Sequence, residues 1–214
     1  MQDSYNDSFK DSNNDSNFKS VVNLFFEVGA LAQTPRSGFF FLGSGKQSVA
    51  EHTNRVAYIG MVMAMLDPSV DSGKVVKMCL LHDLAEARTS DLNYVHQKYV
   101  TADEESAIHE LVKTLDFGDQ LLNLLQEYKD RQSKESIMAK DADNLEWILS
   151  LKEQVDIGNA RAETWMPSAI ARLKTEVGRK IAMEILTTKS DEWWFKKDDE
   201  FYVDRKGHNM DKRW

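Results

Sequence analysis

The stretch KVVKMCLLHDLAEA, residues 74–87, decides how the whole chain is interpreted. Apolar side chains surround most of its length, which predicts a helix over about 73–87 that is buried at the centre of the fold. His82 and Asp83 interrupt this apolar segment. A buried aspartate needs a cation, a hydrogen-bond network or a raised pKa, and a neutral histidine beside it supplies no charge. A divalent metal ion would satisfy both side chains at once.

Glu86 adds a third polar side chain to the same stretch. It stands four residues after His82 and three after Asp83, which puts all three on one side of a continuous helix. The ordinary alternative is a solvated glutamate, but a negative charge near the C-terminus of a helix is mildly unfavourable. Asp91 lies beyond the predicted end of the helix, and beside a metal site it becomes a second candidate carboxylate.

Two neighbouring segments offer further metal ligands. His52 lies in a predicted helix over about 49–66, where a lone histidine is more often a core residue with a hydrogen-bond partner. The segment IMAKDADNLEWILSL, residues 137–151, contains Asp141 and Asp143, and helical periodicity does not choose between them. Imidazole and carboxylate ligands together suit a divalent transition metal that keeps open positions for water and phosphate.

The rest of the chain also has a helical pattern. Only 3 prolines and 10 glycines occur in 214 residues, which favours an all-α chain over a turn-rich β protein. A connector over 36–48 and a loop over 88–100 separate the helices. Apolar periodicity predicts the remaining helices over about 18–32, 102–115, 117–130, 134–157 and 167–188.

Short sequence signals mark where these helices begin. A Ser or Thr that is followed three residues later by Glu has the spacing of a capping box, in which each side chain satisfies a backbone N–H of the other residue. Capping-box pairs occur at Ser48–Glu51 and at Thr101–Glu104. Asp71 or Ser72 is a candidate single cap, and Pro167 has the position of a first-turn proline.

The chain is expected to form one domain with two tails. Residues 1–17 consist mostly of Asp, Asn and Ser and cannot bury enough apolar surface to fold, so they are expected to be a disordered tail. The domain is expected to span 18–197, followed by a mobile, charged tail over 198–214. The aromatic cluster at 193–195 is expected to pack against the domain or a second subunit.

The composition argues against several classes of protein. The net charge of −8 disfavours general nucleic-acid binding, which needs a basic surface. No apolar run approaches the roughly 18 residues of a membrane span, and the first residues lack the pattern of a secretory signal. Because Cys79 is the sole cysteine, a disulfide framework is excluded and a cytoplasmic location is expected.

The order His, His-Asp and Asp on three successive central helices resembles the HD-domain metal-dependent phosphohydrolase superfamily. The segments EHTNRVA (51–57), LLHDLAEARTSDL (80–92) and AKDADNLEW (139–147) are similar to the small single-domain branch that includes 5′-deoxynucleotidases. The resemblance covers about residues 20–195. It implies a compact multi-helix bundle whose metal site lies on the central helices.

The resemblance also implies roles for individual residues. The metal ligands would be His52, His82, Asp83 and Asp143. Glu86 and Asp91 match the acidic pair that this branch uses beside the metal. Glu86 would position or deprotonate the attacking water, and Asp91 would protonate the leaving 5′-oxygen or contact the sugar.

Basic residues near these motifs are candidates for substrate binding. Arg36 matches an arginine that reaches the substrate phosphate, where its planar fork would clamp the oxygens. Its ordinary alternative is a surface arginine after a helix break. Arg55 and Arg88 lie within a turn of proposed site residues, and His96 in the 88–100 loop is a further candidate contact.

The expected function is a metal-dependent phosphomonoesterase that hydrolyses (deoxy)nucleoside 5′-monophosphates. A triphosphohydrolase or phosphodiesterase acting on another nucleotide, and a non-catalytic nucleotide-sensing module, are the alternatives. The metal is expected to be Mn, Co, Fe, Ni or Zn. The partners expected are a small nucleotide and a second copy of the chain in a homodimer, because Phe25 and Phe26 in the first helix and Trp193-Trp194 offer more apolar surface than one small bundle needs. No nucleic acid and no membrane are expected as partners.

Overall fold

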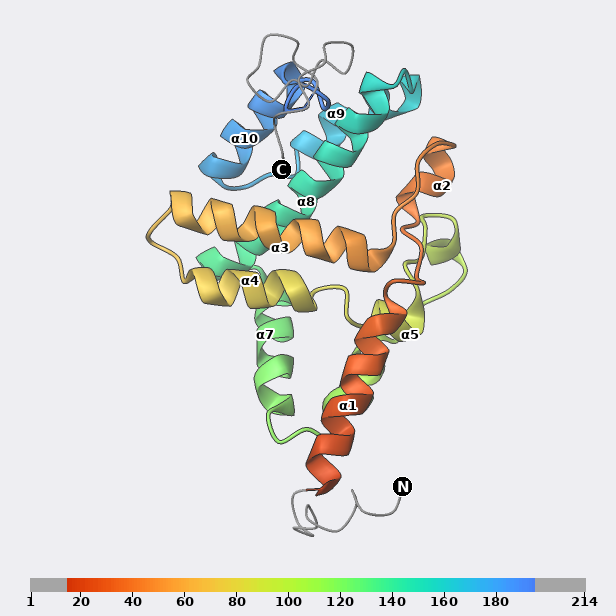
Figure 1. Ribbon diagram of the computed structural model, residues 1–214, viewed down its shortest axis with the longest axis vertical. Coiled ribbons are helices and arrows are strands. Elements are labelled where there is room, and N and C mark those ends of the chain that lie inside the picture. Colours follow the sequence, from red (N-terminus) through yellow and green to blue (C-terminus); the bar gives the residue numbers. More distant parts are fainter. Residues whose placement is uncertain (1–14, 195–214) are drawn as a thin grey trace, which may run out of the picture.

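Three helices that cross at the centre of the molecule carry the segments singled out above. The structure is a computed structural model that describes residues 15–194. Helices α3 (Val49–Leu66) and α4 (Ser72–Leu81) run side by side, and α8 (Lys134–Asp156) crosses both of them (Figure 1). The predicted all-α fold is confirmed over the described residues, where no β-strand forms.

The remaining helices form two groups, one on each side of α3 and α4. In Figure 1 one group lies above α3 and α4, and the other group lies below them. The upper group consists of α9 (Ala160–Ile170) and α10 (Glu176–Thr187). The lower group consists of α1 (Asp15–Ala30), α5 (Glu86–Thr89), α6 (Glu104–Val112) and α7 (Gly118–Asp130). Two short helices lie in connecting segments, α2 (Gly38–Leu42) and the 3-10 helix η1 (His96–Lys98).

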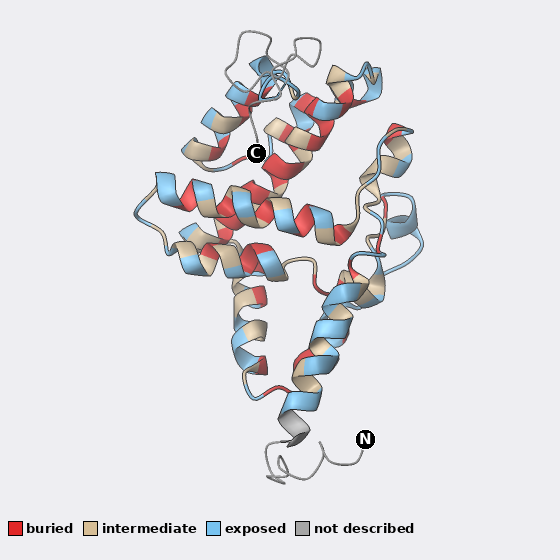
Figure 2. Ribbon diagram, in the orientation of Figure 1, coloured by how far each residue is buried: buried red, intermediate tan, exposed pale blue. Residues whose placement is uncertain are grey.

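The apolar core consists of two clusters. The larger cluster is built mainly from α3, α4, α8, α9 and α10, and the smaller one from α1, α5, α6 and α7. Figure 2 shows buried residues concentrated where α3, α4 and α8 cross. On α3, Val49 belongs to the smaller cluster and Val56 to the larger one. Further along the chain, Cys79 belongs to the larger cluster and Leu84 to the smaller one. The two histidines of these segments therefore lie where the chain crosses from one cluster to the other.

Gly60 allows the three central helices to approach closely. A Cβ atom added at this position would lie 2.6 Å from Cys79 Sγ, 3.2 Å from Val75 Cγ1 and 3.6 Å from Ala142 Cβ. Cys79 is fully buried there, and burial together with Asp143 raises the pKa of its thiol to about 12. The thiol is therefore a core group and not a nucleophile, as its apolar surroundings in the sequence predict.

Side-chain caps explain where most helices begin. The capping box of Ser48 and Glu51 at the start of α3 is confirmed, and Asp71 caps α4 by accepting from Lys74 N. The predicted box at Thr101–Glu104 is wrong. Asp103 caps α6 instead and accepts from Ser106 N, because its carboxylate lies directly before the first helical residue.

The predicted helix over 73–87 is interrupted. Helix α4 ends at Leu81, a turn follows, and α5 begins at Glu86. His82 Nδ1 donates to the carbonyl of Cys79 at 2.8 Å, the group that would accept the N–H of Asp83 in a continued α-helix. The side chain thus competes with the helix ladder, and the chain turns at the pair that the apolar pattern treats as mid-helix.

The predicted helix over 167–188 is also wrong. Two helices, α9 and α10, occupy this region, and Pro167 lies inside α9 instead of in a first turn. The break between them follows from Asp141, whose carboxylate accepts the backbone N–H groups of Lys174 and Thr175 at 2.6–3.0 Å. Thr175 then caps α10 by accepting from Gly178 N.

The two ends of the predicted connector over 36–48 are joined by backbone pairing, which closes the segment at its base. An isolated antiparallel bridge joins Pro35 and Ser48. Arg36 N donates to Gln47 O, and Val49 N donates to Thr34 O, both at 2.8 Å. Helix α2 lies inside this closed segment, so Arg36 is held beside the start of α3.

Several predictions fall at the ends of the chain. The predicted tail over 198–214, residues 1–14 of the tail predicted over 1–17, and Phe195 lie outside the described residues. Helix α1 begins at Asp15, three residues before its predicted start. Among the described helices, none has the length and apolar character needed to cross a membrane.

Candidate metal centre

Four predicted ligands meet where α3, the end of α4 and α8 converge. His52 Nε2 lies 3.3 Å from His82 Nε2, 3.4 Å from Asp83 Oδ2 and 3.2 Å from Asp143 Oδ1. His82 Nε2 lies 3.1 Å from Asp83 Oδ2 and 3.9 Å from Asp143 Oδ1. The His52, His82 and Asp83 ligand atoms lie within 4.8 Å of one another. The structure therefore brings together two imidazoles and two carboxylates from separate segments.

The hydrogen bonds behind the imidazoles determine which nitrogen faces this centre. His82 Nδ1 lies 2.8 Å from a backbone carbonyl, which can only accept, so Nδ1 carries the hydrogen. His52 Nδ1 lies 2.6 Å from Glu146 Oε2 in the same arrangement. In the neutral rings, both Nε2 atoms then carry lone pairs, and these face one another at 3.3 Å. Only a proton or a metal cation between them relieves this contact, so the donor set fits a metal ion.

The charges around the centre agree with this interpretation. Burial alone would raise the pKa of Asp143, but Lys140 and His52 hold it well below its usual value. Burial would lower the pKa of His52, yet hydrogen bonds with Asp143 and Glu146 raise it to about 9. The buried carboxylates therefore retain a proton on His52 when no cation is bound. A metal that takes this place has to displace that proton.

The structure separates the two aspartates that periodicity leaves open. Asp141 is 1 % exposed and points away from the histidines, where it holds the turn before α10 through Lys174 and Thr175. Asp143 lies beside His52 and His82. The arrangement agrees with the choice of Asp143 that the family resemblance implies.

Glu146 supports the centre from behind and is missed by the sequence analysis. It is fully buried in α8, and its Oε1 accepts from Gln47 Nε2 at 2.7 Å and Arg55 Nη2 at 2.6 Å. Burial alone would raise its pKa, but His52 and Arg55 lower it to about 2, so it is a charged acceptor. A carboxylate that holds the far nitrogen of a histidine fixes the ring and makes it a better ligand.

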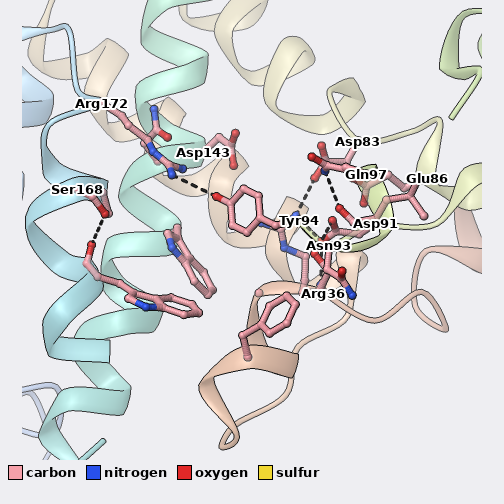
Figure 3. A pocket seen from close by; sticks show the side chains of 18 of the residues that line it. Arg36, Asp83, Glu86, Asp91, Asn93, Tyr94, Gln97, Asp143, Ser168 and Arg172 are labelled. Carbon is pink, nitrogen blue, oxygen red and sulfur yellow. Dashed lines mark hydrogen bonds and ion pairs between the residues drawn. The ribbon is translucent and has the colours of Figure 1, made fainter. Parts of the chain in front are cut away.

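A cavity of about 440 Å³ opens beside the metal centre. Figure 3 shows Asp83, Glu86 and Asp91 on one side of it and Ser168 and Arg172 on the other. Its volume lies within the range of small-molecule sites. Two of the predicted ligands contribute to its wall, together with Arg36, Lys140, Asn144 and aromatic residues.

Arg36 lies between the acidic residues of the cavity. Its Nη1 donates to Asp83 Oδ2 at 3.4 Å and to Asp91 Oδ2 at 3.2 Å. Asp91 also accepts from Ser37 N and Ser37 Oγ, both at 2.9 Å, so it fastens this segment to the 88–100 loop. Arg36 Nε is buried and has no hydrogen-bond partner among the described residues.

The pKa of the Glu86 carboxyl group is strongly raised in the cavity wall. Burial raises its pKa to about 9, and the nearby carboxylates of Asp83 and Asp91 contribute to the shift. Its Oε2 is buried without a partner among residues 15–194. The group therefore binds a proton tightly, which suits a role in proton transfer.

Three of the predicted substrate contacts do not line this cavity. Arg55 turns towards α8 and pairs with Glu146 and Glu153. Arg88 pairs with Glu27 and Glu110, and so connects α5 with α1 and α6. His96 is exposed on η1, whereas its neighbours in the same loop reach the cavity. Spacing along a helix places a residue near a site, but Arg55 and Arg88 pair instead with carboxylates that do not line the cavity.

Part of the opposite wall was not predicted from the sequence. Trp147, Trp165 and Arg172 line it, joined by Tyr94 from the loop. Trp147 could have been found from its position, since it lies four residues after Asp143 and thus one turn along the same face of α8.

Comparisons with known proteins agree with this architecture. The 5′-deoxynucleotidase HDDC2 of Dictyostelium discoideum is 32% identical over 143 residues, which cover 60% of this chain and 75% of that protein. A conserved hypothetical protein from Pyrococcus furiosus has a similar structure, with a TM-score of 0.67 and 28% identity over 78% of this chain and 99% of that chain.

A second solved structure shares the fold at lower identity. It is a predicted metal-dependent phosphohydrolase from Magnetospirillum magnetotacticum MS-1, with a TM-score of 0.64 and 21% identity over 80% of this chain and 92% of that chain. A model of the HD domain matches residues 28–185. That match spans most of the chain and contains every candidate ligand, so the resemblance predicted from the sequence is confirmed. The chain belongs to the HD domain family.

Proposed function

We propose that this protein is a metal-dependent phosphomonoesterase that converts deoxynucleoside 5′-monophosphates to nucleosides and phosphate. One observation supports the proposal above all. Two imidazole nitrogens with lone pairs and two carboxylates converge at one end of a 440 Å³ cavity that Arg36 also lines. The names of relatives such as HDDC2 of Dictyostelium discoideum add the deoxynucleotide substrate.

His52, His82, Asp83 and Asp143 would hold the metal. A divalent ion in this position supplies Lewis-acid activation of water and compensates the charge of a phosphate. Which of Mn, Co, Fe, Ni and Zn is used follows from the supply of metal as well as from these ligands. Glu146 would keep His52 in the orientation that presents Nε2.

Arg36 and Lys140 would bind the phosphate. Arg36 lines the cavity beside Asp83 and Asp91, and its side chain is 16% exposed. Lys140 Nζ lies 2.6 Å from Asp143 Oδ2 and its side chain is 42 % exposed, so it can turn to a second anion. Both cations lie at the metal end of the cavity, where the ester to be cleaved would be placed.

Glu86 and Asp91 would take part in proton transfer and in positioning other groups of the site. Glu86 would position the attacking water or accept its proton. Because the raised pKa keeps this carboxyl group protonated at neutral pH, Glu86 has to release that proton before it can act as the base. The predicted role of Asp91 was proton donor or sugar contact. Its hydrogen bonds to Arg36 and Ser37 support an additional role, which is to position Arg36.

The few cationic residues of the cavity wall suit a monophosphate better than a triphosphate. The cations that line the cavity are Arg36, Lys140 and Arg172, and Arg172 bonds Tyr94 on the opposite side from Glu86. A chain of three phosphates would need a longer cationic wall. Product analysis separates the reactions, because a triphosphohydrolase releases triphosphate.

The test is phosphate release from a panel of nucleoside 5′-monophosphates by protein loaded separately with each metal. We expect turnover with at least one metal and a loss of about 100-fold or more in Glu86→Gln, which retains the proposed ligands. If no phosphate were released from any nucleotide with any metal, the proposal would be wrong. Tight nucleotide binding without turnover would favour the sensing alternative.

We also propose that the protein is a cytoplasmic homodimer. Large apolar side chains are exposed along α1, namely Phe18, Val22, Phe25 and Phe26. Exposed apolar patches of this kind often mark contacts between chains. Light scattering on the purified protein gives the mass in solution, and a monomer at micromolar concentration would contradict the dimer.

A further inference from the structure

The wall of the cavity opposite Glu86 is aromatic. Trp147 from α8, Trp165 from α9 and Tyr94 from the 88–100 loop line it together with Arg172. Figure 3 shows Tyr94 in the middle of the cavity and Arg172 on the side away from Asp91 and Glu86. The proposed phosphate chemistry uses none of these four side chains, so their position requires its own explanation.

Helical geometry sets the separation between this wall and the metal centre. Trp147 follows Asp143 by four residues on α8, about 6 Å along the helix axis at 1.5 Å per residue. Both residues line the same cavity, with Asn144 between them. One turn is the scale of the distance between the 5′-phosphate and the base of a nucleotide, which the sugar spans. A nucleotide with its phosphate at the metal that Asp143 would hold therefore places its base beside Trp147.

Trp147 is held as a rigid platform. Phe39 packs against it edge to face, with the ring centroids 5.7 Å apart, and Trp165 lies at 6.3 Å. A Cβ atom at Gly38 would lie 2.5 Å from the Trp147 ring, so only glycine leaves room for the indole there. A platform fixed in this way is ready to stack with an aromatic ligand without reorganisation.

Tyr94 lies in the middle of the cavity and is hydrogen-bonded to Arg172 (Figure 3). Tyr94 is 66% exposed, and its hydroxyl accepts from Arg172 Nη2 at 3.3 Å. The bond joins the loop after α5 to the end of α9 across the cavity. A large aromatic side chain in a packed core would be buried. Tyr94 instead presents its ring to a space large enough for a ligand.

We propose that Trp147, Trp165, Tyr94 and Arg172 form a nucleobase subsite that selects nucleotides over other phosphate monoesters. The inference rests on the proposed phosphomonoesterase activity and adds the source of its substrate preference. The base stacks on the indoles, and Arg172 donates to acceptor atoms on its edge. Aromatic stacking tolerates different bases, so the subsite selects for a base more than it selects among bases.

The experiment compares a substrate that carries a base with one that does not. For wild-type enzyme, we measure kcat and KM for a deoxynucleoside 5′-monophosphate and for deoxyribose 5-phosphate. We expect kcat/KM to be at least about tenfold higher for the nucleotide. Trp165→Ala should remove about tenfold of that preference, mainly through KM, and leave deoxyribose 5-phosphate unchanged.

Two further variants keep the test independent of folding. Tyr94→Ala alters an exposed ring and should reduce the preference for the nucleotide in the same direction. Trp193→Ala removes an indole that is 78% exposed and is not part of the cavity wall, so it should change neither substrate. Binding gives a second readout, since the nucleotide and not the sugar phosphate should quench tryptophan fluorescence in wild type.

The outcomes separate this inference from the function on which it rests. Equal kcat/KM for the two substrates in wild type, or an equal loss on both in Trp165→Ala, overturns the subsite and leaves the phosphomonoesterase intact. Release of phosphate from neither substrate by metal-loaded wild type overturns both.

Discussion

At the scale of single residues, Glu146 links the metal centre to the protein surface. Its carboxylate holds His52 on one side and Arg55 on the other, and Arg55 continues to the half-exposed Glu153. A buried carboxylate without the cation behind it would pay a desolvation cost and tend to take up a proton. Arg55 therefore keeps Glu146 charged, although it lies outside the substrate cavity.

We expect Glu146→Gln to weaken metal binding by about 10- to 100-fold, because the amide is a weaker acceptor for His52 Nδ1–H. Competition with a chromophoric chelator measures the Kd. The matched control is Glu153→Gln, the same substitution at the exposed end of the chain of contacts, which should change the Kd less than about twofold. An unchanged Kd in Glu146→Gln would show that the carboxylate has no part in metal binding.

Some residues of this centre can be predicted from the sequence, and others cannot. His82, Asp83 and Glu86 are recognisable because polar groups in an apolar segment require a partner. Glu146 is not, since a glutamate within a helix has an ordinary explanation in solvent. Arg55 and Arg88 show the limit of spacing arguments. Each can reach more than one carboxylate. Only the folded structure shows whether such a side chain binds a substrate or forms an ion pair within the protein.

At the scale of elements, the close crossing of α3, α4 and α8 depends on the missing side chain at Gly60. Alanine would favour the helix by about 1 kcal/mol, but overpacking a fixed core costs about 1–3 kcal/mol. The nearest atoms, Cys79 Sγ and Val75 Cγ1, belong to buried residues that cannot move into solvent. The cost therefore exceeds the gain.

We expect Gly60→Ala to lower the free energy of unfolding by about 1–2 kcal/mol, as measured by urea denaturation. Gly29→Ala is the matched control, because a Cβ at that position in α1 meets nothing within 4 Å. It should leave the protein as stable or raise its stability by up to about 1 kcal/mol. Equal effects of the two substitutions would refute the packing explanation.

The end of α8 is fastened to the segment after α10 by Asp156. Its carboxylate accepts from Lys152 Nζ at 2.5 Å and from Ser190 N at 2.8 Å. Burial alone would raise the pKa of Asp156, but Lys152 and Ser190 lower it to about 2. Since the folded-state pKa is below the unfolded value, the contribution is present above that unfolded value and is lost as the pH falls towards 2.

Asp156→Asn should therefore destabilise the protein by about 2 kcal/mol at pH 7, with a smaller difference at lower pH. The difference between wild type and variant should shrink between about pH 4 and pH 2, the interval from the unfolded to the folded pKa. Urea denaturation at several pH values measures it. A difference that stays constant over this interval would exclude the carboxylate as its cause.

Element boundaries were predicted well where local signals set them. Ser48 with Glu51 begins α3 as expected, since the capping box is a local interaction. The break at His82 and the break between α9 and α10 could not be read from periodicity. Each depends on a side chain that takes over a backbone group, His82 on a carbonyl and Asp141 on two N–H groups.

At the scale of the whole molecule, the metal centre lies between the two apolar clusters. Val49 and Val56 on α3 belong to different clusters, and so do Cys79 and Leu84. A metal bound between these segments would join the two halves of the core. The all-α fold was predictable from composition and periodicity, whereas the division of the core required the three-dimensional arrangement.

Metal removal should therefore lower the melting temperature of the whole domain. A ligand at 100 times its Kd stabilises the folded state by about 2.7 kcal/mol, which corresponds to about 5–10 °C for a chain of this length. Calorimetry with and without a chelator measures the shift. His82→Ala should abolish it, and His109→Ala, which alters an exposed histidine on α6, should retain it. A shift that survives in His82→Ala would place the metal elsewhere.

The closed base of the 36–48 segment has a consequence for how the chain can vary. Pro35 and Ser48 are paired, and backbone hydrogen bonds at Arg36 and Val49 fix the two ends of the segment. The separation of Arg36 from the start of α3 is thus independent of the length of chain between them. An insertion at the exposed tip of the segment, next to Lys46, would leave Arg36 and the start of α3 in place, because the base stays paired and Ser44 stays bonded to Gln154 and Asn159. This tip is a position where another sequence could be grafted without disturbing the chemistry at the base.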